Sequence, residues 1–105
     1  MSNQDTVLQE LNERLRELYG DRLVKLVLFG SRARGDNDPD SDYDVLVVLK
    51  GHVNPFNESR FAIDTTAEIG LKYAVTISCI YASDRRFEDD KGLLIRNIRN
   101  QGRAI

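Results

Sequence analysis

The chain has 105 residues, of which 41% are hydrophobic and 30% charged, a composition typical of a folded globular protein and not of a disordered one. A single domain over residues 1–105 is therefore predicted. The net charge of −2 gives no electrostatic reason to expect nucleic acid or a membrane as a direct partner, and no apolar run approaches the roughly 18 residues of a membrane span.

The first predicted element is a helix over residues 6–19, where apolar side chains recur at helical spacing. Thr6 and Gln9 fit the spacing of a capping box at its start. Gly20 is a suitable residue to end it.

Two strands follow the helix. Residues 23–29 are almost continuously apolar, as expected for a strand that is covered on both faces. The polar stretch 31–41 contains Gly35 and Pro39 and is predicted to be a loop, and a second strand follows at about 43–49.

The second half of the chain continues this alternation. Residues 57–69 carry apolar side chains at helical spacing, and Gly70 is expected to end the helix. Residues 73–81 are rich in β-branched and aromatic side chains and predict a third strand.

The C-terminal part predicts two further helical segments. Ser83 and Asp84 can cap a short helical turn that runs to Phe87, and an amphipathic helix ends at Gly102 before a short edge strand at 103–105. The complete order predicts an α/β (α+β) fold in which helices pack on a small mixed sheet.

Two aspartates open the second predicted strand. Asp42 and Asp44 are two residues apart, so their side chains should project from one face of the strand, with Tyr43 turned outward between them. Adjacent carboxylates repel each other, and a divalent cation or a shared proton is the usual remedy.

Gly30 and Ser31 lie where the first predicted strand ends and a turn or short helix begins. Free backbone N–H groups at such a place suit phosphate oxygens. A phosphate site beside a carboxylate pair indicates metal-assisted chemistry on a nucleoside triphosphate.

Two better-known motifs do not fit this stretch. Residues 30–35 match the first six positions of a P-loop, but Asp36 and Asn37 stand where Lys and Ser or Thr are required. The alternating aspartates do not provide the glycine and the final glutamate of an EF-hand loop. Asp36, Asp38 and Asp40 are interpreted as turn residues, a position that aspartate favours.

The combination of Gly30-Ser31, ten intervening residues and Asp42-Tyr43-Asp44 resembles the signature of minimal nucleotidyltransferases, a branch of the DNA polymerase beta superfamily. Ala33-Arg34-Gly35 and the C-terminal stretch 94–102 are also similar to this family. The resemblance covers essentially the whole chain and implies the polymerase beta-like nucleotidyltransferase fold. Small proteins of this kind are often antitoxins encoded beside a HEPN-domain ribonuclease toxin.

The resemblance also implies roles for individual residues. Gly30 and Ser31 would hold the triphosphate of ATP, and Asp42 and Asp44 would bind one or two Mg²⁺ ions. Arg32 and Arg34 would offset phosphate charge or would simply be solvated.

The implied reaction transfers AMP from ATP to a tyrosine hydroxyl of the HEPN toxin. The single cysteine separately favours the reducing cytoplasm as its location. The alternative is an antitoxin that masks its toxin sterically without turnover. The oligomeric state is left open by the sequence.

One feature departs from the family pattern. Polymerase beta-like enzymes commonly carry a third carboxylate on the strand that corresponds to residues 73–81, and this stretch has none. Thr76 and Ser78 occupy the candidate positions, and Ser78 is favoured. A hydroxyl is neither an anionic metal ligand nor a strong base near neutral pH. Two carboxylates therefore suffice, or the domain binds nucleotide with little turnover.

Three other features have a structural interpretation. His52 is expected to be an incidental loop residue, and Cys79, the single cysteine, a small core residue of a protein in a reducing compartment. The basic residues near the C-terminus either meet an acidic partner or form a solvated helix face: Arg85, Arg86, Lys91, Arg96, Arg99 and Arg103.

Overall fold

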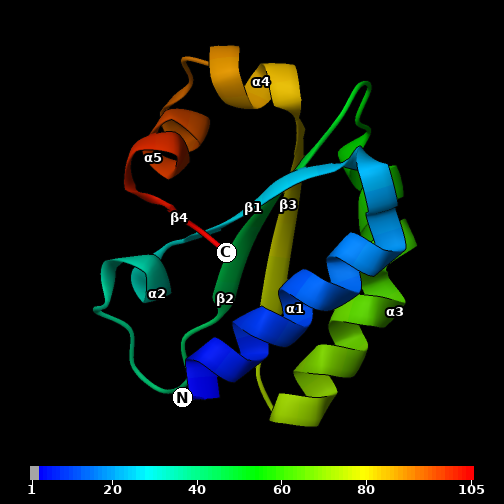
Figure 1. The fold of residues 1–105 in the computed structure, drawn as a ribbon. Coiled ribbons are helices and arrows are strands. Elements are labelled where there is room, and N and C mark those ends of the chain that lie inside the picture. The colour runs from blue at the N-terminus through cyan, green and yellow to red at the C-terminus, as the bar shows by residue number, and fades with distance from the viewer. Residues whose placement is uncertain (1–2) are drawn as a thin grey trace.

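The sheet has four strands in the order β3-β2-β1-β4. The computed structural model describes residues 3–105 and gives the strands as β1 (Leu23–Phe29), β2 (Tyr43–Leu49), β3 (Ile77–Ser83) and β4 (Arg103–Ala104) (Figure 1). β1 pairs antiparallel with β2 and with β4, whereas β2 pairs parallel with β3. The predicted small mixed sheet is confirmed.

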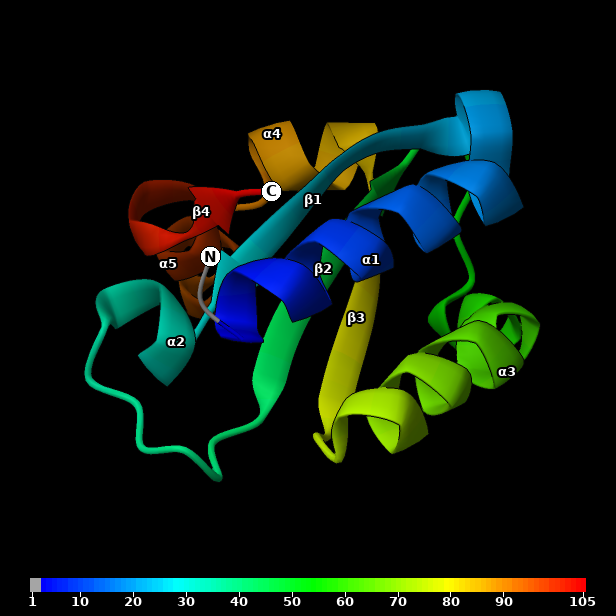
Figure 2. The same cartoon turned by 60° about the horizontal axis from the view of Figure 1, so that its bottom comes forward.

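Helices α1 (Asn3–Tyr19) and α3 (Pro55–Tyr73) lie side by side on one face of the sheet (Figures 1 and 2). Their buried side chains and the inward residues of the strands form the larger core cluster, which includes Leu11, Leu15 and Ile69. Burial of such side chains contributes roughly 1.5–3 kcal/mol each and dominates the stability of this layer.

The opposite face of the sheet is covered by α4 (Asp84–Asp89) and α5 (Leu93–Gln101), which form a smaller core cluster with it. The short helix α2 (Ser31–Arg34) follows β1 directly, and a 3₁₀ turn, η1 (Gly20–Arg22), joins α1 to β1. Since α4 and α5 are short, this face is covered over only part of its length.

Successive side chains of β2 point to opposite faces of the sheet, as the two-residue period of a strand requires. Tyr43, Val45 and Val47 belong to the cluster beneath α1 and α3, whereas Leu46 and Val48 belong to the cluster beneath α4 and α5. Asp44 therefore projects from the α4/α5 face, at the end of the strand where it enters the sheet.

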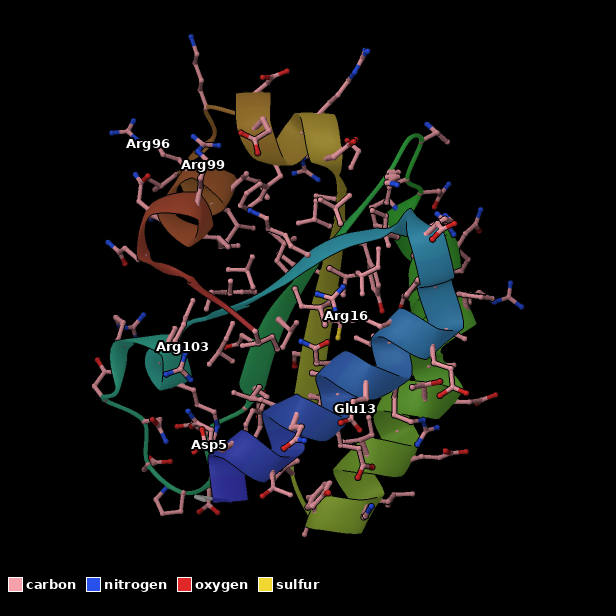
Figure 3. The ribbon with its side chains drawn as sticks, viewed as in Figure 1. Asp5, Glu13, Arg16, Arg96, Arg99 and Arg103 are labelled. Atoms are coloured by element: carbon pink, nitrogen blue, oxygen red, sulfur yellow. The ribbon has the colours of Figure 1, made fainter. Side chains whose placement is uncertain are left out.

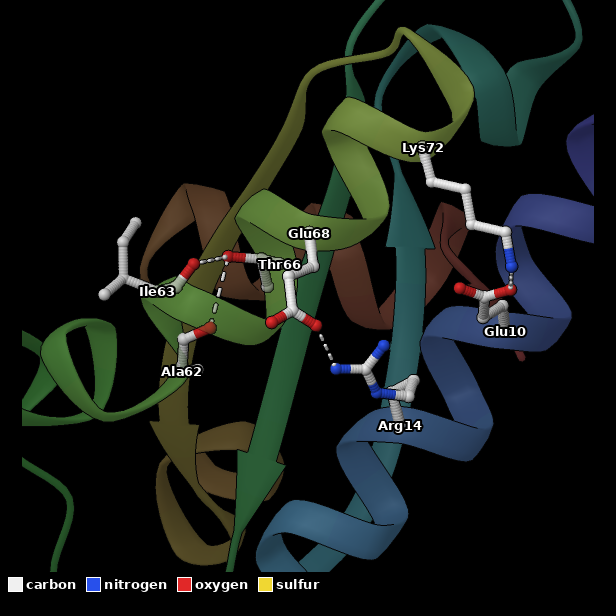
Figure 4. A network of polar contacts seen from close by, with 7 residues as sticks. All are labelled: Glu10, Arg14, Ala62, Ile63, Thr66, Glu68 and Lys72. Atoms are coloured by element: carbon white, nitrogen blue, oxygen red, sulfur yellow. Dashed lines mark hydrogen bonds and ion pairs between the residues drawn. The ribbon is translucent and has the colours of Figure 1, made fainter.

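Two ion pairs join α1 to α3 (Figure 4). Glu10 accepts from Lys72 Nζ at 2.6 Å, and Glu68 accepts from Arg14 at 2.7 Å. Such exposed pairs contribute about 0–1 kcal/mol each, so the packing of the two helices on the sheet depends mainly on their buried apolar side chains.

The start of α1 differs from the prediction. The helix already includes Asn3, so Thr6 lies within the helix and the capping box with Gln9 is wrong. The spacing of Thr and Gln alone does not distinguish a helix start from a helix interior. The predicted end is confirmed, because α1 stops at Tyr19 and Gly20 has φ +56°.

Helix α3 is longer than predicted at both ends, and Gly70 does not end it. The helix closes with a Schellman pattern, in which Val75 N–H donates to Gly70 O at 2.9 Å and Ala74 takes the left-handed position with φ 54°. A side chain at residue 70 would collide with Val75 O. The glycine is thus needed by this closure, three residues before the helix ends.

The extension of α3 displaces the third strand. The predicted strand over residues 73–81 begins instead at Ile77 and ends at Ser83. β1, β2, the Ser83-capped helix α4, the last helix and its end at Gly102 agree with the prediction. Within residues 3–105, none of the helices is long and apolar enough to cross a membrane.

Candidate active site

The carboxylate of Asp44 lies directly over the backbone of Gly30. Asp44 is paired with Phe29 across the antiparallel β1/β2 ladder, so it stands beside the last residue of β1. Gly30 has φ +74°, and a Cβ atom built on it would be 2.6 Å from Asp44 Oδ2. Only glycine leaves room for this carboxylate at the entrance to α2.

The entrance to α2 presents backbone donors beside that carboxylate. Gly30 O accepts from the N–H groups of Ala33 and Arg34 at 3.1 and 3.2 Å. In residues 3–105, the N–H groups of Ser31 and Arg32 and the Ser31 hydroxyl make no hydrogen bond. Donors of this kind suit phosphate oxygens.

The Asp44 carboxyl is affected by its surroundings and by Asp42. Burial raises the pKa of the Asp44 carboxyl, and the negative charge of Asp42 raises it further. A cation between the two carboxylates would relieve both effects, and oxygen donors are the ligands that Mg²⁺ prefers. Within residues 3–105 no group of three or more His, Cys, Asp or Glu side chains converges on one point.

Ser78 is the cross-strand neighbour of Asp44 in the parallel β2/β3 ladder. The two side chains therefore leave the sheet on the same face, as expected for the position of the third carboxylate. Thr76 precedes β3, and its carbonyl accepts from Tyr43 N–H at 2.9 Å. Of the two candidates, Ser78 is thus the one beside Asp44.

The comparison with known proteins matches residues 8–104 to the nucleotidyltransferase domain family. The chain belongs to this nucleotidyltransferase family.

Curated relatives and a solved structure agree with this membership. The chain is 34% identical to "Putative protein adenylyltransferase MJ0604" of Methanocaldococcus jannaschii over 98% of both chains. It is 35% identical to "Putative protein adenylyltransferase MJ0141" of the same organism, over 70% of this chain and 74% of the relative. A crystal structure described as a putative nucleotidyltransferase from Sulfolobus solfataricus superposes with a TM-score of 0.63 at 22% identity, covering 97% of this chain and 81% of the other. That structure shows the same fold, the nucleotidyltransferase fold that the sequence predicts.

Tyr43 does not turn outward from the nucleotidyltransferase domain, and that prediction is wrong. Its side chain is only 2% exposed and belongs to the core beneath α1. The Arg32 guanidinium lies over the ring, 3.9 Å from its centroid. Alternation along the strand explains the result, because the side chains of Tyr43 and Asp44 leave β2 on opposite faces, and the face of Tyr43 is the one that packs on α1.

Arg32 is buried and connects the loop before β2 to α1. Its guanidinium donates to Ser41 O at 2.9 Å and to Pro39 O at 3.3 Å, and also to Gln4 Oε1 at 3.0 Å. These bonds hold the segment that leads into Asp42. The planar, five-donor guanidinium suits several acceptors at once.

Arg34 has a different environment, since it is exposed and forms an ion pair with Asp36 at 3.2 Å. The loop beyond it is closed by Asp38, whose Oδ1 accepts from Asp40 N–H and from the Ser41 hydroxyl. These contacts confirm Asp38 as a turn residue. Arg34 is thus held only by a surface ion pair, whereas Arg32 is buried and bonded to three acceptors.

A pocket of about 150 Å³ lies between α2 and α5, next to Gly30. Phe29 and Ile98 give it an apolar floor, and the amides of Asn97 and Gln101 stand on its α5 wall. Sequence reasoning did not single out these two amides. They are one turn apart on α5 and lie within the stretch 94–102 that resembles the family, but that resemblance assigned no role to either side chain.

The other residues considered in the sequence analysis either pack within the protein or lie in solvent. Arg99 donates to Phe87 O at 2.8 Å and to Asp90 O at 3.1 Å, which joins α5 to α4, whereas Arg96 points into solvent (Figure 3). Cys79 packs against the larger core cluster, and burial raises the pKa of its thiol to about 12, as expected for a core residue. His52 is exposed in the loop after β2.

Proposed function

We propose that this protein transfers AMP from ATP to a tyrosine hydroxyl of a cognate HEPN-domain ribonuclease toxin and thereby neutralises it in the cytoplasm. The relatives named as protein adenylyltransferases support the transfer of AMP to a protein. The observation that carries the proposal is the Asp44 carboxylate seated against Gly30, beside the free donors of Ser31.

ATP would bind with its phosphates at the entrance to α2. The N–H groups of Ser31 and Arg32 and the Ser31 hydroxyl would donate to phosphate oxygens, with Arg34 available to offset charge. Asp42 and Asp44 would hold one or two Mg²⁺ ions. When bound, such ions neutralise charge on the phosphates and lower the pKa of the attacking hydroxyl.

The transfer makes one bond and breaks one. The tyrosine oxygen attacks the α-phosphorus in line, the new O–P bond forms, and the bond to the pyrophosphate oxygen breaks, so that pyrophosphate leaves. The phenolic proton passes to solvent or to pyrophosphate, because the Ser78 hydroxyl cannot accept it near neutral pH. The chain's own contribution is to hold and orient the phosphates.

The absence of a carboxylate at residue 78 favours a second candidate function. Ser78 stands beside Asp44 where the family pattern has an acid. An antitoxin that binds its toxin and masks it sterically needs no base at this position. Both candidates use the same partner, and they differ in whether the acidic pair is required.

The two candidates are separated by the product on the toxin. Incubating the protein with ATP, Mg²⁺ and the toxin encoded beside it should add one or more AMP masses to a toxin tyrosine, read by intact-protein and peptide mass spectrometry. Asp42→Asn and Asp44→Asn should abolish the mass shift while the complex still forms. Asp40→Asn is the matched control, because this exposed aspartate lies in the same loop. A complex that protects cells without any mass shift would refute AMP transfer and support masking.

A further inference from the structure

The pocket between α2 and α5 has no part in the phosphate and metal roles proposed above. Both helices lie beside the end of β1 (Figures 1 and 2), and Phe29 and Gly30 contribute to the lining. Phe29 is the cross-strand neighbour of Asp44, and it packs with Leu46 on the α4/α5 face, from which Asp44 also projects. The pocket therefore borders the place where the Asp44 carboxylate lies against Gly30.

The lining of this pocket is apolar at its floor and polar along α5. Phe29 and Ile98 form the floor, and Leu94 at the rim is 55% exposed. Asn97 and Gln101 are four residues apart, so they lie on the same side of α5. In the described chain, residues 3–105, neither of their side-chain amides makes a hydrogen bond. Both amides are thus available to a ligand.

The size of the pocket restricts what it can hold. Sites for a complete drug-sized ligand measure roughly 300–1,000 Å³. A volume of about 150 Å³ is therefore suited to one ring system and not to a whole nucleotide. An aromatic base has apolar faces for the floor and a polar edge for the amides of α5.

The two amides favour adenine among the bases. A side-chain amide carries a donor and an acceptor next to each other, and Asn or Gln pairs in a bidentate manner with the N6 amino group and the N7 acceptor of adenine. In guanine the N6 amino group is replaced by the O6 acceptor, so the amide oxygen would face another acceptor. An unpaired polar group of this kind lowers affinity.

We infer that the pocket binds the adenine base of ATP, with the base on Phe29 and Ile98 and its amino-bearing edge on the amides of Asn97 and Gln101. The inference rests on the proposed function, since the phosphates of the same ATP would extend past Gly30. One ligand then occupies both the pocket and the phosphate site.

The α5 wall of the pocket is held in place by packing. A Cβ atom on Gly102 would collide with Val27 Cγ1 and with Ile98 O, so the end of α5 lies directly against β1. Beyond it, Ile105 N–H donates to Leu26 O at 3.0 Å and continues the sheet. A wall that is already ordered lowers the entropic cost of binding.

Titration calorimetry in the presence of Mg²⁺ separates the base from the phosphates. Wild type should bind ATP about tenfold or more tightly than GTP or inorganic tripolyphosphate. Asn97→Leu and Gln101→Leu remove the amides from exposed positions and should each reduce the preference for ATP over GTP. The double variant should abolish this preference and leave the affinity for tripolyphosphate unchanged. Asn100→Leu is the matched control, an exposed residue of α5 outside the pocket lining, and should keep the preference.

The possible results distinguish this inference from the proposed function. If wild type binds tripolyphosphate as tightly as ATP, or if the double variant keeps the preference for ATP, the base does not lie on these amides and the inference is wrong, whereas AMP transfer is still supported. If neither ATP nor tripolyphosphate binds, the proposed function fails and the inference fails with it.

Nuclear Overhauser effects locate the base without any variant. In wild type saturated with ATP and Mg²⁺, the H2 and H8 protons of adenine should show effects to the methyl groups of Leu94 and Ile98. This measurement depends neither on turnover nor on the folding of a variant. Effects confined to methyl groups outside the pocket, or no effect to either residue at saturation, would overturn the inference.

Discussion

The Asp44 carboxylate occupies the space where a side chain on residue 30 would lie, with Oδ2 2.6 Å from the position of a Cβ atom there. The contact joins the end of β1 to the start of β2, and it depends on the antiparallel register that sets Phe29 opposite Asp44. Because of this contact, Asp44 can take its position only if residue 30 has no side chain. Both residue types are needed for the carboxylate to lie against the turn that begins α2.

Gly30→Ala tests this constraint. Residue 30 has φ +74° and ψ −158°, a conformation open almost only to glycine, and the added methyl group meets Asp44. We expect a loss of about 3 kcal/mol in the free energy of unfolding, together with loss of nucleotide binding. Gly35→Ala is the control, with φ +80° but no atom within 4 Å of the new methyl group, and it should cost about 1 kcal/mol. Urea unfolding of both variants measures the difference, and equal losses would contradict the proposed clash.

Arg32 is predicted to hold the loop rather than the nucleotide. Arg32→Ala removes donors from two backbone carbonyls and leaves the Tyr43 ring without its cover, which should lower the free energy of unfolding by about 1–3 kcal/mol. Arg32→Lys should recover little of the loss, because one ammonium cannot reach the same acceptors. Arg34→Ala should leave stability unchanged. If Arg32→Ala instead lowered only nucleotide affinity, the loop-holding role would be wrong.

Ser78 offers a test of the missing carboxylate. Ser78→Ala should keep AMP transfer within about threefold of wild type, because a hydroxyl is not a base near neutral pH. Ser78→Asp puts a third carboxylate beside Asp44 and should lower the melting temperature without Mg²⁺ through like-charge repulsion. Added Mg²⁺ should reverse that loss in the variant more than in wild type, as followed by thermal unfolding with and without the ion. A melting temperature that does not respond to Mg²⁺ would contradict the proposal that Asp42 and Asp44 hold Mg²⁺ beside Ser78.

Glu10 should give the fold a pH-dependent contribution. Its carboxylate accepts hydrogen bonds from Lys72 Nζ and Tyr73 OH, which lower its pKa below the ordinary value. Because the pKa of Glu10 is lower in the folded state than in the unfolded state, the ionised carboxylate adds to the free energy of unfolding at pH values above the unfolded-state pKa. This contribution disappears as the pH falls through the folded-state pKa. The difference in unfolding free energy between wild type and Glu10→Gln should therefore be present at neutral pH and shrink on acidification. A difference independent of pH would assign the effect to packing of α1 on α3.

Local signals in the sequence were sufficient where an element depends on its own residues. The strand ends at Phe29 and Leu49, the Ser83 cap of α4 and the end of α5 at Gly102 all agree with the structure. Each of these is set by an apolar run or by a capping residue within a few positions.

Predictions failed where a distant contact decided the outcome. Gly70 resembles a helix stop, but α3 continues beyond it because Ile69 and its neighbours pack on the sheet and Val75 closes the helix against Gly70. Tyr43 resembles an outward residue beside two aspartates, but its face of β2 is the one that α1 and Arg32 cover.

The sequence by itself determined which segments form strands and which side chains are available for chemistry. The strands, the acidic pair and the glycine-serine turn follow from residue spacing and side-chain type. Only the tertiary structure decided which groups meet. The pairing of Asp44 with Ser78, the turn of Arg32 toward the loop and the free edge of β3 depend on strand register and sheet order. Register and order are set by the summed packing of two core clusters, which is a property of the whole chain and of no local segment.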